Sequence, residues 1–175
     1  MGLIIGFDPG INGSAAALCP ADADGPEFIA DAIDLPTMPD GSKRQIDDFA
    51  LERWLRRLGR VSHAVIENVR AMPSIPDEDG ERRSMGSASA FRFGMAAGQL
   101  RATVRMVLQI EPEFVEPAVW KRYFALSSDK EESRRLALRL FPHSAYLLTR
   151  KKDHQRAEAM LVAKWRARPL IGRGW

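Results

Sequence analysis

"LIIGFDPGINGSAAAL", residues 3–18, contains two apolar runs separated by a turn, and the first run ends in the acid Asp8. Short apolar segments bounded by Pro, Gly and Asn are typical of strands, so strands are expected over 3–8 and 14–19. A carboxylate at the end of a buried strand loses hydration and needs a compensating partner. Asp8 is therefore a candidate functional residue, and a turn-forming Asp before Pro-Gly is the alternative interpretation.

The rest of the chain extends this pair of strands into a mixed sheet. A third strand over 28–35 would complete an antiparallel meander, and "HAVIENV" at 63–69 predicts another strand with the acid Glu67 near its end. Further elements are expected as a helix over 44–59 with Ile46, Phe49 and Trp54 on its apolar face, a helix over 88–108, a strand at 113–117, a helical turn at 117–124, and helices over 128–142 and 153–168. Ser128 is the expected N-cap of the helix over 128–142. This order indicates an α/β fold, with a mixed sheet of about five strands, the first three antiparallel, covered by helices.

Length and composition favour one globular domain over 1–175. The 175 residues are 45% hydrophobic and 28% charged, values that are ordinary for a folded domain. No apolar stretch is long enough for a membrane span and no signal segment is recognised, so a cytoplasmic location is expected, with no membrane partner. The single Cys19 excludes an internal disulfide, and three His residues give no zinc pattern.

Two segments of the chain indicate a functional role. From Lys121 to the end of the sequence, Lys and Arg clearly outnumber Asp and Glu, which favours nucleic acid over a neutral ligand. A solvated helix face is the alternative explanation. The polar segment at 70–89 is too long for a simple connection, and a functional or mobile loop is expected there.

Asp8, Glu67 and Glu158 form a candidate metal site. If the strands that carry Asp8 and Glu67 are neighbours, their carboxylates converge and a divalent cation is the economical compensating charge. Glu158 on the last helix would complete the cluster. The alternatives are a strand-end salt bridge for Glu67 and an exposed pair with Arg156 for Glu158.

A fourth ligand is expected shortly before Glu158. His154 lies four residues earlier and shares its helix face if the helix begins before it, whereas Asp153 lies about 140° away on the helical wheel. Asp153 as an N-cap residue could still turn its carboxylate inward. The residues slightly favour His154, and both remain candidates.

Four stretches in order resemble the RuvC-type Holliday junction resolvases, particularly bacteriophage-like members. They are "GFDPGINGSAAAL", "HAVIENVRAMP", "VEPAVWKRYFALSSDKEESRRLALRLFP" and "RAEAMLVA". The resemblance implies an RNase H-like fold, a homodimer, and Mg²⁺-dependent cleavage of four-way DNA junctions into paired symmetric nicks.

The resemblance also implies roles for individual residues. Asp8, Glu67 and Glu158 match the family's catalytic acids, while Asp153 or His154 stands near the position of its fourth ligand. The expected cofactor is two Mg²⁺ ions per site, with Mn²⁺ able to substitute. The residues expected to contact branched DNA are Lys121 and Lys130 near the scissile phosphate, and Arg70, Arg82 and Arg83 in the loop.

Two other functions compete with a resolvase. A noncatalytic junction-binding protein on the same fold is compatible with the irregular fourth ligand. An ATPase of the actin or sugar-kinase type also ends its first strand in Asp before a Gly-containing hairpin, but it needs a second domain of comparable size, so this chain would be a fragment of one.

Overall fold

The core of the protein is a five-stranded mixed sheet. The computed structural model describes residues 2–20, 27–68, 86–127 and 129–167. The strands lie in the order β3-β2-β1-β6-β7, with bounds β1 (Leu3–Asp8), β2 (Ser14–Cys19), β3 (Phe28–Asp34), β6 (Val61–Glu67) and β7 (Glu113–Val115). β1, β2 and β3 are antiparallel to one another, while β6 and β7 continue the sheet in parallel pairing from β1. The predicted mixed α/β sheet is therefore confirmed.

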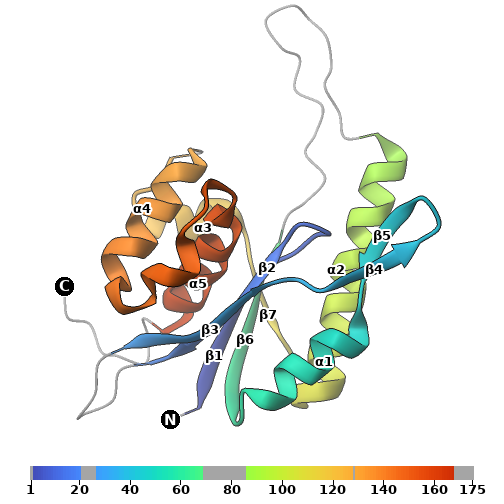
Figure 1. Ribbon diagram of the computed structural model, residues 1–175, viewed down its shortest axis with the longest axis horizontal. Helices are drawn as coiled ribbons and strands as arrows, with labels where there is room; N and C mark the ends of the chain where they lie inside the picture. The colour runs from blue at the N-terminus through green and yellow to red at the C-terminus, as the bar shows by residue number, and fades with distance from the viewer. Residues whose placement is uncertain (1, 21–26, 69–85, 128, 168–175) are drawn as a thin grey trace, which may run out of the picture.

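Helices cover both faces of this sheet (Figure 1). One layer consists of α1 (Asp48–Arg57) and α2 (Ser87–Leu108). The opposite layer consists of α3 (Pro117–Tyr123), α4 (Lys130–Leu140) and α5 (His154–Ala167), with the 3-10 segments η1 (Pro142–Leu148) and η2 (Lys151–Asp153) between α4 and α5. Each layer closes its own hydrophobic core against the sheet, and β1 contributes to both.

Side chains of β1 alternate between the two layers, as the two-residue period of a strand requires. Ile5 and Phe7 belong to the core under α1 and α2, whereas Ile4 belongs to the core under α5. Gly6 also faces α5, and a Cβ atom at this position would lie 2.1 Å from the carbonyl oxygen of Ala159. Asp8 is the next member of the same row, so β1 directs its carboxylate toward the α5 layer.

The turn after Asp8 depends on two glycines. Gly10 has a φ of 124°, a conformation that residues with a Cβ rarely adopt. A Cβ on Gly13 would lie 2.0 Å from the carbonyl oxygen of Asp8. The Gly13 N–H donates to the Gly10 carbonyl at 3.0 Å, which closes the turn and starts β2. The turn that begins at Pro9-Gly10 therefore ends β1 at Asp8.

A hairpin replaces the beginning of the helix predicted over 44–59. The antiparallel pair β4 (Thr37–Asp40) and β5 (Lys43–Ile46) meets at Gly41, whose φ is 56°. Ile46 therefore ends a strand, and Asp47 caps α1 by accepting the Ala50 N–H at 2.9 Å. The assignment of Phe49 to the apolar face was wrong, because its side chain is 74% exposed and α1 buries Leu51, Trp54 and Leu55.

Two further boundaries differ from the sequence prediction. The helix expected over 88–108 is present as α2 and begins at Ser87, so the loop expected over 70–89 ends earlier; its residues 70–85 lie outside the described residues. Ser128, the expected N-cap, also lies outside them. Asp129 caps α4 instead, because its Oδ1 accepts the Glu131 N–H at 3.0 Å.

Within the described residues, no helix combines the length and the apolar character needed to cross a lipid bilayer.

Candidate active site

Asp8 and Glu67 end two neighbouring parallel strands on the same face of the sheet. β1 and β6 pair in register up to Phe7 and Ile66, so the two acids follow at one edge. The row that contains Val65 faces the α5 layer, and Glu67 continues that row. Asp8 is half-buried, while Glu67 is only 6% exposed. The convergence expected from the sequence is therefore present in the backbone.

Glu158 reaches the same region from α5. It is 7% exposed, and its Oε1 forms an ion pair with the Lys121 ammonium at 3.0 Å and accepts a hydrogen bond from the Ser133 hydroxyl at 3.4 Å. Arg156, the partner expected in the alternative interpretation, instead pairs with Asp34 at 2.6 Å. Glu158 is thus directed into the protein toward α3 and α4.

The three acids influence one another electrostatically. Burial raises the pKa of Asp8 well above its usual range, and the charges of Glu67 and Glu158 raise it further. Burial also raises the pKa of Glu67, although the hydrogen bond from Trp120 acts in the opposite direction. Neighbouring negative charges in a poorly hydrated setting favour a cation, so this end of the sheet is a candidate cation site.

Trp120 is a site residue that sequence reasoning missed. Its side chain is fully buried and its Nε1–H donates to Glu67 Oε1 at 3.0 Å. The hydrogen bond fixes one carboxylate oxygen of Glu67 and leaves the other available. The neighbouring residue Lys121 holds Glu158, so consecutive residues of α3 each hold one acid. Only the packing of α3 beside β6 and α5 reveals this role, because the sequence "VWKR" reads as an ordinary amphipathic turn.

Lys121 and Lys130 both act electrostatically on Asp8. Their positive charges lower the pKa of Asp8, in opposition to burial and to the neighbouring carboxylates. The Lys121 side chain is 22% exposed, and its ammonium lies 5.2 Å from the centre of the Trp120 ring. Lys130 is exposed at the first position of α4. The expected arginines Arg70, Arg82 and Arg83 lie outside the described residues.

Asp153 is engaged in holding the chain before α5. It is 2% exposed, and its two carboxylate oxygens accept the backbone N–H and the guanidinium of Arg150 at 2.6–2.9 Å. Burial by itself raises the pKa of Asp153, but the hydrogen bonds from Arg150 outweigh it and lower the pKa below its ordinary value. These contacts satisfy the carboxylate within its own turn.

His154 is the first residue of α5 and presents one ring nitrogen without a partner. Its Nδ1 lies 3.2 Å from the Lys151 carbonyl oxygen. A carbonyl oxygen only accepts, so this contact places a proton on Nδ1, and in the neutral imidazole Nε2 then carries a lone pair. Among the described residues, Nε2 is buried and has no hydrogen-bond partner. The helix begins at His154 itself, rather than before it as the wheel argument supposed.

The ligand types fit a hard divalent cation, but the side chains are spread. Asp8, Glu67 and Glu158 supply the carboxylate oxygens that Mg²⁺ prefers, and His154 Nε2 is an orphaned acceptor. Within the part of the chain that the structure describes, no three His, Cys, Asp or Glu side chains are already gathered at metal-binding distances. Trp120 and Lys121 instead hold Glu67 and Glu158 by one oxygen each.

The fold is similar to those of two solved junction resolvases. RuvC of Thermus thermophilus, in complex with a Holliday junction substrate, is 14% identical with a TM-score of 0.67, and the match covers 97% of this chain and 96% of RuvC. The fowlpox virus Holliday junction resolvase is 10% identical with a TM-score of 0.52, over 95% of this chain and 99% of that protein. No protein-family model and no curated protein sequence matches this chain. The chain therefore has the RuvC fold of the RNase H-like class, as the sequence resemblance implied.

Proposed function

We propose that this protein is a structure-selective endonuclease that resolves four-way DNA junctions by metal-dependent phosphodiester hydrolysis. The observation that carries the proposal is the meeting of Asp8, Glu67 and Glu158 at one end of a RuvC fold. Three partly desolvated carboxylates are costly, and among the residues that the structure describes the Lys121 ammonium pairs with Glu158 alone, so a bound cation would compensate the remaining negative charge. The structural neighbours named for Holliday junctions support the same substrate class.

The proposed cofactor is Mg²⁺, two ions per site, with Mn²⁺ as a substitute. Divalent ions activate a water nucleophile and neutralise charge on the attacked phosphate. Asp8 and Glu67 present their carboxylates from adjacent strand ends, and Glu158 approaches from α5. Lys121 pairs with Glu158 at 3.0 Å, so its ammonium would become available to a substrate phosphate if Glu158 held a metal ion.

His154 is the proposed fourth ligand. Its Nδ1–H donates to the Lys151 carbonyl, the arrangement that fixes the tautomer of metal-binding histidines in other proteins. Its Nε2 is then left with a lone pair and no described partner. Asp153 is the weaker candidate because Arg150 already bonds to both of its carboxylate oxygens.

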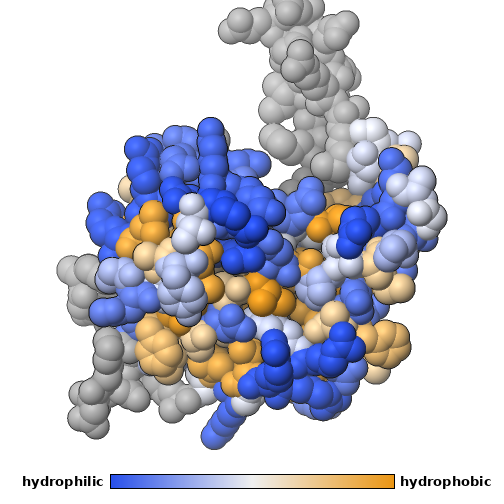
Figure 2. All heavy atoms as spheres, in the orientation of Figure 1, coloured by the Kyte–Doolittle hydropathy of each residue, from blue (hydrophilic) through white to orange (hydrophobic). Residues whose placement is uncertain are grey.

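Lys121 and Lys130 are the proposed phosphate-binding residues of the site. Both lie close enough to affect the Asp8 carboxylate, and ammonium groups stabilise charge that develops on a phosphate. Figure 2 shows hydrophilic side chains gathered over α4 on the viewed face. Arg70, Arg82 and Arg83 are proposed to extend this DNA contact from the loop.

A homodimer is proposed through the α1 and α2 layer. Phe49 of α1 and Met106 of α2 are each 74% exposed and line one groove of about 360 Å³ between the two helices. Phe91 and Met95 extend the apolar surface along α2, at 70% and 46% exposure. This layer lies opposite α3, α4 and α5, so a partner bound there leaves the acids accessible to DNA. A two-fold dimer places two sites on the two symmetric strands of a junction.

The test is incubation of the protein with a mobile four-way DNA junction and Mg²⁺, followed by mapping of the nicks. Paired nicks at symmetric positions, abolished by EDTA and absent from linear duplex of the same sequence, are expected. Tight junction binding without nicks in Mg²⁺ or Mn²⁺ would instead support the noncatalytic junction-binding protein. ATP hydrolysis without DNA cleavage would support the kinase-like alternative. The proposed activity belongs in the cytoplasm of a bacterial or phage-infected cell, and that location stays a prediction.

A further inference from the structure

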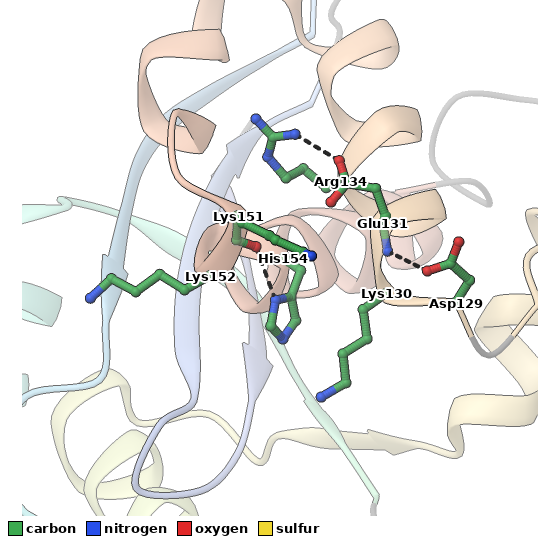
Figure 3. A pocket seen from close by; sticks show the side chains of 7 residues that line it. All are labelled: Asp129, Lys130, Glu131, Arg134, Lys151, Lys152 and His154. Atoms are coloured by element: carbon green, nitrogen blue, oxygen red, sulfur yellow. Dashed lines mark hydrogen bonds and ion pairs between the residues drawn. The ribbon is translucent and has the colours of Figure 1, made fainter.

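A groove of about 870 Å³ lies between the start of α4 and the η2 segment (Figure 3). Its lining includes four cationic side chains, Lys130, Arg134, Lys151 and Lys152. Two carboxylates, Asp129 and Glu131, and the imidazole of His154 complete it. Lys151 and Lys152 are not among the residues that the sequence assigned to any site.

The two carboxylates of the groove are engaged by neighbours. Asp129 accepts the Glu131 N–H at 3.0 Å and lies 3.7 Å from the guanidinium of Arg135. Glu131 pairs with Arg134 at 2.8 Å. Their negative charge is therefore largely compensated by groups that already contact them, and it opposes an incoming anion only weakly.

The three lysines have no such compensation. Lys130, Lys151 and Lys152 are exposed, and within the described residues no carboxylate lies within ion-pair distance of their ammonium groups. The N-termini of α4 at Lys130 and of α5 at His154 also meet this groove, and the N-terminal end of a helix carries partial positive charge. The groove therefore presents a net positive potential.

Both walls of the groove are fixed before any ligand binds. Arg134 donates from Nε and a terminal nitrogen to the Leu148 carbonyl at 3.0 and 2.8 Å, which ties α4 to η1. On the other wall, His154 Nδ1 lies 3.2 Å from the Lys151 carbonyl, and Asp153 is bonded to Arg150. Because these walls are already ordered, ligand binding does not have to include the entropic cost of ordering them.

The groove opens beside the acid cluster. Lys130 lines the groove and also acts electrostatically on Asp8. His154 lines it one helical turn before Glu158. In Figure 3 the side chains of Lys130 and His154 extend to the same side of the groove, whereas Lys152 extends away from them. A chain of anions that runs outward from the acids along this path passes Lys130 and His154 first and then Lys151 and Lys152.

We propose that this groove binds the backbone phosphates of the DNA strand next to the phosphate that is cut, with Lys151 and Lys152 as its outer contacts. The inference rests on the proposed nuclease function. Ammonium groups without partners suit phosphodiesters, which are singly charged and regularly spaced. Bases need not enter, so the contact fixes strand position without reading sequence.

The test compares two double variants of equal charge. Lys151→Gln/Lys152→Gln changes the groove, and Arg57→Gln/Arg60→Gln changes two exposed arginines beside the start of β6, at the opposite end of that strand from Glu67. Junction affinity is measured by fluorescence anisotropy in Ca²⁺ over a series of salt concentrations. Each lost phosphate contact lowers the slope of log Kd against log salt by about 0.7–0.9, so a fall of about 1.5 is expected for the groove variant alone.

Ethylation interference then locates the contact. Ethylation of phosphates on one side of the cut is expected to block DNA binding by the wild-type protein. Binding by the groove variant is expected to be insensitive to the same modification. An unchanged slope for the groove variant, or an equal fall of the slope in both double variants, would contradict the proposal that the groove binds backbone phosphates. A wild-type protein that neither binds nor cuts junctions would overturn the proposed function itself, which is a different result.

Discussion

Asp8, at the end of the central strand β1, destabilises the folded protein when its carboxylate is ionised. Burial and the charges of Glu67 and Glu158 raise its pKa well above the ordinary value of about 3.9. Between these two pKa values the folded state binds more protons than the unfolded state. Without metal, the free energy of unfolding therefore falls as pH rises through this window.

Asp8→Asn is expected to remove this pH-dependent loss of stability. In EDTA at pH 7–8, the variant should melt about 2–4 °C above wild type, the shift that about 1 kcal/mol produces in a domain of this size. The difference in melting temperature should shrink toward pH 4, where Asp8 of the folded wild-type protein is protonated and therefore uncharged, like the asparagine of the variant. Thermal denaturation at several pH values measures it. The same variant should bind junctions and not cut them, and parallel melting curves at all pH values would contradict the electrostatic account.

Trp120 is expected to position Glu67 for metal binding. Trp120→Phe keeps the buried ring but removes the Nε1–H that Glu67 Oε1 accepts at 3.0 Å. Loss of a residue that orients a ligand typically weakens metal affinity about 10-fold or more. Calorimetric titration of the DNA-free protein with Mn²⁺ measures this affinity.

Trp54→Phe provides the matched control. Its Nε1–H donates to Asp31 at 2.7 Å on the α1 side of the protein, so it loses a comparable hydrogen bond far from the acids. Its Mn²⁺ affinity should equal that of wild type. A similar loss in both variants would mean that Trp120 acts only through stability.

His154 and Asp153 are separated by a pair of alanine variants. His154→Ala should weaken Mn²⁺ binding about 10-fold and abolish cleavage, because Nε2 is its available acceptor. Asp153→Ala should keep cleavage and lower stability by about 1 kcal/mol, since it loses the hydrogen bonds to Arg150. The reverse pattern would make Asp153 the ligand.

The acids could be predicted from the sequence, but their partners could not. Asp8 and Glu67 are recognisable because a charge at the end of an apolar run is anomalous by itself. Trp120 carries no such anomaly, since a tryptophan in an amphipathic turn reads as core until the fold places α3 beside β6. The choice between His154 and Asp153 depends on where α5 begins, a boundary that helical periodicity does not define.

At the scale of the elements, Gly6 marks a close backbone contact between β1 and α5. Gly6→Ala would place a Cβ 2.1 Å from the Ala159 carbonyl oxygen and 2.6 Å from the Ala163 nitrogen. Both are backbone atoms of α5, so the helix itself must move. A loss of about 3 kcal/mol or more is expected, together with weaker metal binding because Glu158 moves with α5.

Gly94→Ala on α2 is the control for Gly6→Ala. A Cβ at Gly94 meets no atom within 4 Å, and alanine favours a helix over glycine. Thermal denaturation at equal protein concentration should show a large decrease in melting temperature for Gly6→Ala and none for Gly94→Ala. Similar melting temperatures in the two variants would contradict the tight contact.

The strands of the main sheet were predictable, whereas the β4–β5 hairpin was not. β1, β2 and β3 carry apolar runs with clear turn residues at their ends. The segment 37–46 is mostly polar and exposed, so it has neither an apolar run nor a period that identifies a strand. Its pairing depends on Gly41 at the turn and on Arg44, which donates to the Thr37 hydroxyl at 2.7 Å.

At the scale of the whole molecule, the two helical layers separate the proposed chemistry from the proposed dimer contact. Phe49→Asp/Met106→Asp places charges in the exposed groove of α1 and α2 and should convert a dimer into monomers, as light scattering measures. The expected functional result is loss of paired nicks. Tyr146→Asp, on the exposed surface of η1 at 68% exposure, is the control and should remain dimeric. A wild-type monomer at all concentrations would contradict the dimer.

The alternation of β1 has a consequence for how such sequences can diverge. Each residue of β1 points to the opposite layer from the next, and Asp8 lies in the row of Ile4 and Gly6. Insertion or deletion of a single residue before Asp8 would exchange the two rows, turn the carboxylate toward α1 and α2, and bring a side chain against Ala159. Substitutions that preserve the pattern do neither. In this strand, selection should therefore tolerate wide changes of residue type and eliminate changes of length.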